Sequence, residues 1–109
     1  MISTVANRKK LKECRMRSEV ERVKEALSSY VARHAGGGFV VFGSSARDEM
    51  RYDSDLDILV DFPAESERNA WEYAERMCIE HGIKPDLHLA SEASSELLDR
   101  VYQEGSTIR

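Results

Sequence analysis

The sequence is poor in cysteine and contains no long apolar run. Its two cysteines, Cys14 and Cys78, match no metal-binding or redox motif in their spacing, so nothing supports a disulfide. No stretch reaches the length of a membrane-spanning helix and no signal-peptide pattern opens the chain, so we expect a cytoplasmic protein. With 109 residues, the chain suffices for one domain with a modest core and leaves no room for a second lobe.

A surplus of positive charge is also absent: 20 acidic residues outnumber 16 basic ones, and the net charge of −4 argues against a general nucleic-acid binder. Six basic residues nevertheless gather near the N-terminus: Arg8, Lys9, Lys10, Lys12, Arg15 and Arg17. Residues 1–16 show no useful apolar periodicity, which predicts a flexible basic extension ahead of a domain at residues 17–109. An RNA-binding arm is the alternative, but no aromatic residues are interleaved there for base stacking.

Glycine-rich nucleotide-binding loops are missing as well. The glycines at 36–38 precede the first apolar run, and neither GxGxxG nor GxxxxGK[ST] can be read there. They are predicted to end a helix that begins at Ser18, where Ser18 and Glu21 have the form of a capping box. Apolar residues recur in this helix at spacings of three and four: Val20, Val23, Leu27 and Val31.

The stretch at 39–62, FVVFGSSARDEMRYDSDLDILVDF, organises the rest of the chain. Its two apolar runs are bounded by turn residues and predict two β-strands. Asp55 and Asp57 occupy alternate positions and therefore project to one side, whereas Leu56 and Ile58 face a core. Neighbouring carboxylates repel each other unless a cation lies between them, and Mg²⁺ prefers oxygen ligands. The pattern therefore predicts a metal site.

A Gly-Ser turn follows the first of these strands. The connector from Gly43 to Asp55 is short enough to return the chain beside the strand it left, which predicts an antiparallel pair. A glycine lets backbone approach a ligand closely, and the N–H groups of a short helix opening at Ser44 and Ser45 would suit a phosphate. A metal site beside a phosphate cradle indicates phosphoryl or nucleotidyl transfer.

After Pro63 the sequence predicts a helix at residues 66–82, a strand at residues 84–90 and a final helix at residues 94–102. In the strand, Asp86 and His88 share a face, but the residues alone leave Asp86 equally well explained as part of a Pro-Asp turn. The rise per residue places His88 about 6.6 Å beyond Asp86 and Asp61 about 13 Å beyond Asp57. Both residues are therefore expected to lie outside the site.

These motifs resemble a known family. Gly43-Ser44, a spacer of ten residues and then Asp55-Leu56-Asp57 resemble the signature of the DNA polymerase beta-like nucleotidyltransferase superfamily. Ala46-Arg47, Asp53-Ser54 and Ile58-Leu59-Val60 are similar to its smallest branch, the minimal nucleotidyltransferases, although Asp48 stands where that branch often has glycine. The resemblance implies an α/β (α+β) fold, a small mixed sheet with helices packed on one face like the nucleotidyltransferase palm.

The resemblance also implies a site and a reaction. Asp86 would join Asp55 and Asp57 as catalytic residues and ligands of two Mg²⁺ ions, with Mn²⁺ as an alternative metal. The triphosphate of ATP would lie against four residues of the turn: Gly43, Ser44, Ser45 and Arg47. Proteins of this branch are commonly antitoxins that transfer AMP to a tyrosine of a helical HEPN-domain partner. The alternatives are a non-catalytic binding antitoxin and a small-molecule adenylyltransferase of the aminoglycoside-modifying kind.

Overall fold

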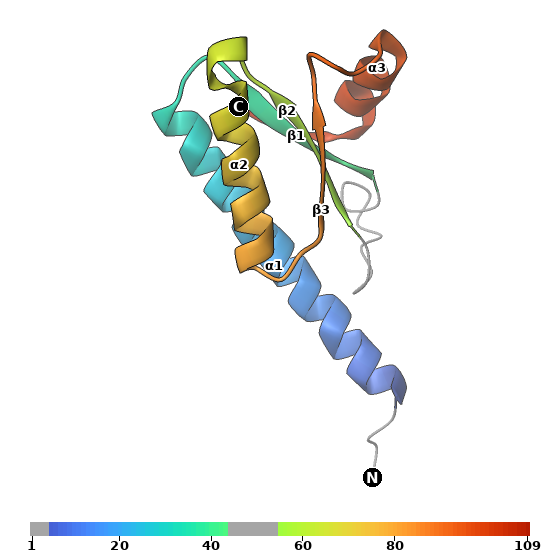
Figure 1. The fold of residues 1–109 in the computed structure, drawn as a ribbon. Helices are drawn as coiled ribbons and strands as arrows, with labels where there is room; N and C mark the ends of the chain where they lie inside the picture. Colours follow the sequence, from blue (N-terminus) through green and yellow to red (C-terminus); the bar gives the residue numbers. More distant parts are fainter. Residues whose placement is uncertain (1–4, 44–54) are drawn as a thin grey trace.

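The computed structural model describes residues 5–43 and 55–109, with side chains from Arg17 onward, and forms two helices against a sheet with a third helix on its far side (Figure 1). The elements in chain order are α1 (Val5–Arg33), β1 (Gly38–Phe42), β2 (Leu56–Asp61), α2 (Ala64–Glu80), β3 (Pro85–Leu89), α3 (Ser95–Glu104) and β4 (Ser106–Ile108). The strands form one mixed sheet in the order β3-β2-β1-β4. This α+β architecture confirms the predicted fold class.

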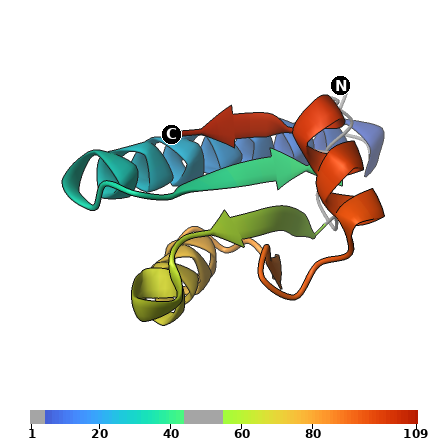
Figure 2. The ribbon, with the colours of Figure 1, turned by 90° about the horizontal axis from the view of Figure 1, so that it is seen from above.

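The strand pairings set the register on which the site depends. β1 and β2 are antiparallel with Phe42 opposite Asp57, and β2 and β3 are parallel with Asp57 opposite Asp86. The antiparallel direction matches the expectation from the short connector, and the parallel pair makes the sheet mixed, as the resemblance implies. The short strand β4 was not expected; it pairs antiparallel with β1, beside which it lies in Figure 2.

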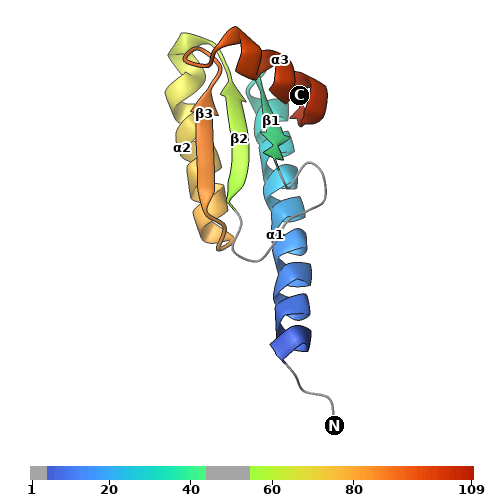
Figure 3. The ribbon, with the colours of Figure 1, turned by 90° about the vertical axis from the view of Figure 1, so that its right-hand side faces the viewer.

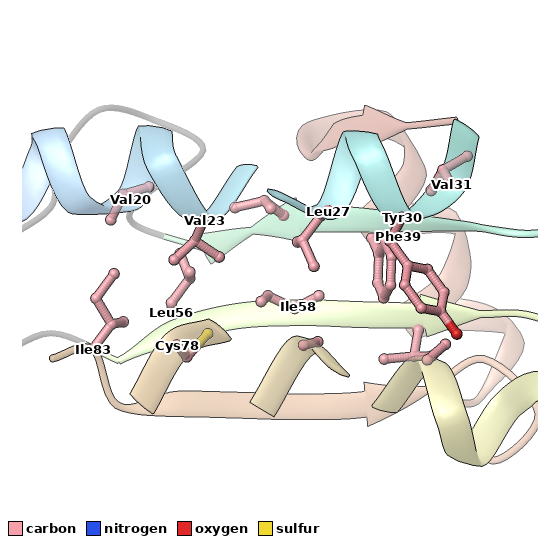
Figure 4. Packing of buried hydrophobic residues seen from close by; sticks show 14 of the residues in the cluster. Val20, Val23, Leu27, Tyr30, Val31, Phe39, Leu56, Ile58, Cys78 and Ile83 are labelled. Carbon is pink, nitrogen blue, oxygen red and sulfur yellow. The ribbon is translucent and has the colours of Figure 1, made fainter. Parts of the chain in front are cut away.

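One face of the sheet carries the main core. Leu56 and Ile58 of β2 lie on either side of Asp57 in the sequence and are fully buried against α1 and α2. Figure 4 shows Leu27 of α1 and Cys78 of α2 in this core, which therefore holds both helices against the strands. The thiol of Cys78 has a pKa raised to about 12 by burial, as expected for a structural cysteine.

The opposite face is covered over part of its area by α3. Val40 of β1, Leu59 of β2 and Val101 of α3 form a second buried cluster. Figure 1 accordingly shows α1 and α2 on one side of the strands and α3 on the other. The helices were expected on one face only, and α3 corrects that detail. Its apolar stripe packs on the second face because α1 and α2 already occupy the first.

Helix α1 is longer than predicted. It begins at Val5, so Ser18 and Glu21 lie inside the helix and the expected start with a capping box is wrong. In Figures 1 and 3, the N-terminal part of α1 extends beyond the sheet. The division of the chain at residue 17 therefore stays a prediction. Among the described helices, none combines the length and the apolar character needed to cross a bilayer.

Candidate active site

The candidate site lies at the end of the second sheet face that α3 leaves uncovered. Antiparallel pairing places the end of β1 beside the start of β2, and parallel pairing places the start of β3 beside them. Phe42, Asp57 and Asp86 therefore form one row across three strands. Because side chains alternate along a strand, Asp57 and Asp86 project on the same side, away from the main core. The register thus brings together two carboxylates that are 29 positions apart in the sequence.

His88 belongs to this cluster, although its backbone spacing from Asp86 predicts a position outside the site. Asp57, Asp86 and His88 each offer a ligand atom, and these atoms lie within 4.8 Å of one another. Nε2 of His88 is 3.4 Å from Oδ1 of Asp86. The rise between backbone positions does not include the length of the imidazole side chain, which reaches back along the strand. The i, i+2 spacing of Asp86 and His88 was the signal that could have identified it.

Burial and the neighbouring carboxylate of Asp86 raise the pKa of Asp57. Asp57 is half-buried, and loss of solvent is the largest cause that raises its pKa. The hydrogen bond and negative charge of Asp86 raise it further, to about 6, while His88 acts in the opposite direction. Asp55 adds a smaller upward effect from its exposed position before β2. A cation between these groups would remove that repulsion.

Gly43 borders directly on Asp57. Its φ of 78° lies in the left-handed region, and a Cβ at this position would overlap the Asp57 carboxylate. A glycine is therefore required both by the turn and by the close approach of the backbone to the carboxylate. Ser44, Ser45 and Arg47 lie outside the described residues, so their assignment to phosphate stays a prediction.

Asp61 occupies the same face of β2 but has a different environment. Its carboxylate accepts a hydrogen bond from the Tyr102 hydroxyl and lies 3.4 Å from Nη2 of Arg109. Arg109 also donates to the Tyr102 hydroxyl at 3.0 Å. This network ties β2 to α3 and to the end of the chain, so Asp61 has a packing role at the covered end of the face.

The donor set suits a divalent cation. Carboxylate oxygens are ligands for hard ions such as Mg²⁺, and an imidazole nitrogen adds affinity for transition metals. Asp57 and Asp86 supply the oxygens and His88 the nitrogen, all at an accessible end of the sheet. With Gly43 holding backbone against Asp57, the arrangement can place a metal-bound phosphate next to the carboxylate row.

Comparison with known proteins agrees with this geometry. A model of the nucleotidyltransferase domain matches residues 20–105. A solved structure described as a minimal nucleotidyltransferase is 30% identical, with a TM-score of 0.63 over 83% of this chain and 93% of that chain. A toxin–antitoxin structure with AMP-PNP is similar in fold, with a TM-score of 0.55 at 20% identity over 85% of this chain and 72% of that chain. No curated protein matches.

The matched range contains every described residue of the candidate site, from Gly43 through Asp57 to His88. Nucleotidyltransferases as a class act on nucleoside triphosphates with divalent metal ions, and the carboxylate row is a site of the kind that this chemistry needs. The chain therefore belongs to the nucleotidyltransferase domain family.

Proposed function

We propose that this protein transfers AMP from ATP to a hydroxyl group of a partner protein in a Mg²⁺-dependent reaction. The observation that carries the proposal is the register that sets Asp57 opposite Asp86, with Gly43 against the Asp57 carboxylate. Two carboxylates held close together at the end of a sheet do not stabilise the fold, because they repel each other. Within a nucleotidyltransferase domain, their proximity is explained by cation binding.

The chain's own residues have separate roles in this reaction. Asp55, Asp57 and Asp86 would hold divalent cations, which supply charge neutralisation and lower the pKa of the attacking hydroxyl. The backbone at Gly43 lets the triphosphate approach the carboxylates, and Ser44, Ser45 and Arg47 would bind its β- and γ-phosphates. The acceptor oxygen forms a bond to the α-phosphorus while the bond to the bridging oxygen breaks, so pyrophosphate leaves and the hydroxyl proton passes to solvent or a nearby base.

A groove next to the cluster suits an acceptor side chain. It encloses about 260 Å³ at the edge of β3, and Trp71, Leu87 and Leu97 contribute apolar surface. His88 lines this groove and also belongs to the carboxylate cluster, so the groove leads to the site. An apolar wall that ends at polar groups suits a tyrosine, which has an apolar ring and a terminal hydroxyl. We therefore infer that a tyrosine is the acceptor.

Filling the groove should block the acceptor without disturbing the nucleotide. Ala93 lines the groove, and Ala93→Trp would place an indole in it. We expect transfer to the partner to fall by about tenfold or more, because the acceptor can no longer reach its reactive position. ATP binding should stay unchanged in calorimetry. Ala35→Trp, at an exposed position after α1, is the matched control. Equal transfer rates in the two variants would contradict the groove assignment.

The proposed partner is a helical HEPN-domain toxin, which this chain would neutralise as an antitoxin. The similarity in fold to a toxin–antitoxin structure with AMP-PNP supports this part of the proposal. The same similarity favours one alternative, an antitoxin that neutralises by surface contact alone. Transfer of label from α-labelled ATP to the partner separates the two functions, since contact alone leaves the partner unlabelled.

Metal and ATP should bind with strong coupling. The carboxylate cluster is negatively charged, so it repels a triphosphate until a cation is present. We expect ATP to bind at least about tenfold more tightly in millimolar Mg²⁺ than in EDTA, as measured by calorimetry. Asp99→Asn, at an exposed position of α3, should retain this coupling. Equal ATP affinity in Mg²⁺ and in EDTA would exclude the metal-site assignment.

A further inference from the structure

His88 approaches the carboxylates closely enough to share an ion with them. Its Nε2 lies 3.4 Å from Asp86 Oδ1, and the ligand atoms of Asp57, Asp86 and His88 all lie within 4.8 Å of one another. Two donors at about 2.1 Å from one ion are at most about 4.2 Å apart. Side-chain movements of about half an ångström would therefore place all three donors around a single cation.

The backbone and a neighbouring ring hold His88 in this position. It follows Asp86 by two residues on β3 and therefore shares its face, opposite Leu59 in the parallel register. The Phe42 ring of β1 lies 5.5 Å from the imidazole, measured between ring centroids. The side chain is 35% exposed, which leaves room for a solvent-borne ion to enter.

The other two histidines have partners away from the cluster. His34 stacks on Tyr30 with ring centroids 4.2 Å apart, and Nδ1 of His81 lies 2.5 Å from Oε2 of Glu19. Each of those contacts explains the residue without a ligand. His88 differs because its ion-pair partner, Asp86, is itself a carboxylate of the candidate site.

We propose that His88 binds, through Nε2, a divalent cation that Asp57 and Asp86 also hold, and that this nitrogen ligand shifts the preference of the site from Mg²⁺ towards Mn²⁺ and similar transition ions. The inference rests on the proposed function, because it needs a cation at the carboxylates. Mg²⁺ strongly favours oxygen donors, whereas imidazole binds first-row transition ions well. A neutral imidazole also adds a ligand without adding another repelling negative charge.

Calorimetry of the full chain with Mn²⁺ and with Mg²⁺ measures this preference. His88→Gln replaces the nitrogen by an amide oxygen of similar reach. We expect Mn²⁺ affinity to fall by about tenfold or more, while Mg²⁺ affinity changes by less than about threefold. His34→Gln is the matched control and should bind both ions as the unmodified protein does. Equal losses for both ions, or no loss for either, would overturn the proposal.

Pulsed electron paramagnetic resonance of bound Mn²⁺ tests the ligand directly. We expect coupling to a nitrogen nucleus in the unmodified protein and in His34→Gln, and no such coupling in His88→Gln. If His88→Gln does not fold, ¹⁵N-labelled histidine in the unmodified chain replaces it, and the coupling should then change to that of ¹⁵N.

The outcomes separate this inference from the proposed function. Mn²⁺ that binds without coupling to a histidine nitrogen would overturn the role of His88 and leave the carboxylate site standing. Failure of both Mn²⁺ and Mg²⁺ to bind would overturn the inference and the metal-dependent function together.

Discussion

Asp57→Asn is expected to reduce nucleotidyl transfer by about a thousandfold or more while leaving the fold intact. Asp57 lies between Gly43 and Asp86 at the centre of the carboxylate row, so its loss removes a negative ligand at the point where charge must be balanced. Initial rates of label transfer, with circular dichroism as a check on folding, measure the effect. A fully active variant would exclude Asp57 from the reaction.

Asp61→Asn is the matched control, since it changes an aspartate on the same face of the same strand. Asp61 bonds to Tyr102 and Arg109, so we expect its replacement to cost about 1 kcal/mol of unfolding free energy while transfer stays near normal. The two variants should therefore affect different properties: Asp57→Asn should lose transfer activity, whereas Asp61→Asn should lose stability. Loss of transfer in both variants would contradict the division of this face into a site and a packed end.

Asp57→Asn should also raise the melting temperature of the metal-free protein, with a gain that grows as the pH rises above about 3. The pKa of Asp57 is raised from 3.8 to about 6 in the folded protein. Below about pH 3 the carboxyl is largely protonated in both the folded and the unfolded state, so it favours neither. As the pH rises towards 6, the unfolded chain loses this proton first, and the folded state is progressively disfavoured. Melting curves in EDTA should show a gain at pH 8 that shrinks towards zero at about pH 3. A variant that melts many degrees lower at pH 8 would instead give Asp57 a structural role.

Gly43→Ala is expected to reduce transfer by about a hundredfold or more, because it displaces the Asp57 carboxylate. The added Cβ would overlap that carboxylate, and the φ of 78° disfavours any other residue. We expect a stability loss of about 1–2 kcal/mol together with a large loss of Mg²⁺ affinity. Denaturant unfolding and calorimetry measure these two effects separately.

Gly82→Ala separates backbone strain from contact with the carboxylate. Gly82 has a similar φ of 70°, but a Cβ there would have no atom within 4 Å. It should lose a comparable amount of stability and keep full transfer and metal affinity. If Gly43→Ala behaved in the same way as Gly82→Ala, the close approach of Gly43 to Asp57 would have no functional importance.

The local part of this structure could be predicted because it follows from alternation. The apolar runs of β1 and β2 indicated which residues face the core, and the buried Leu56 and Ile58 confirm it. Asp86 was ambiguous in the sequence, because a ligand role depends on pairing with a distant strand. The register that sets it opposite Asp57 is a tertiary property. The family resemblance supplied Asp86 as the third ligand.

The position of α3, the strand β4 and the start of α1 could not be predicted from the sequence, each for a physical reason. The apolar stripe of α3 shows which side of the helix is buried but not which face of the sheet receives it. The strand β4 has only three residues, too few for a pattern. The true start of α1 was not predicted because Ser18 and Glu21 have the form of a capping box, although residues before them, including Lys10 and Leu11, also favour a helix. Backbone spacing alone places His88 outside the site, because it does not include the reach of the imidazole side chain.

The central claim is tested most directly by incubating the full chain with Mg²⁺, α-labelled ATP and the protein encoded beside it. The proposed reaction predicts label on a tyrosine of that partner. With γ-labelled ATP the partner should stay unlabelled, because the γ-phosphate leaves as part of pyrophosphate. Label should also be absent with Asp57→Asn and present with Asp61→Asn. A tight complex that forms without any label on the partner would contradict nucleotidyl transfer and establish neutralisation by contact.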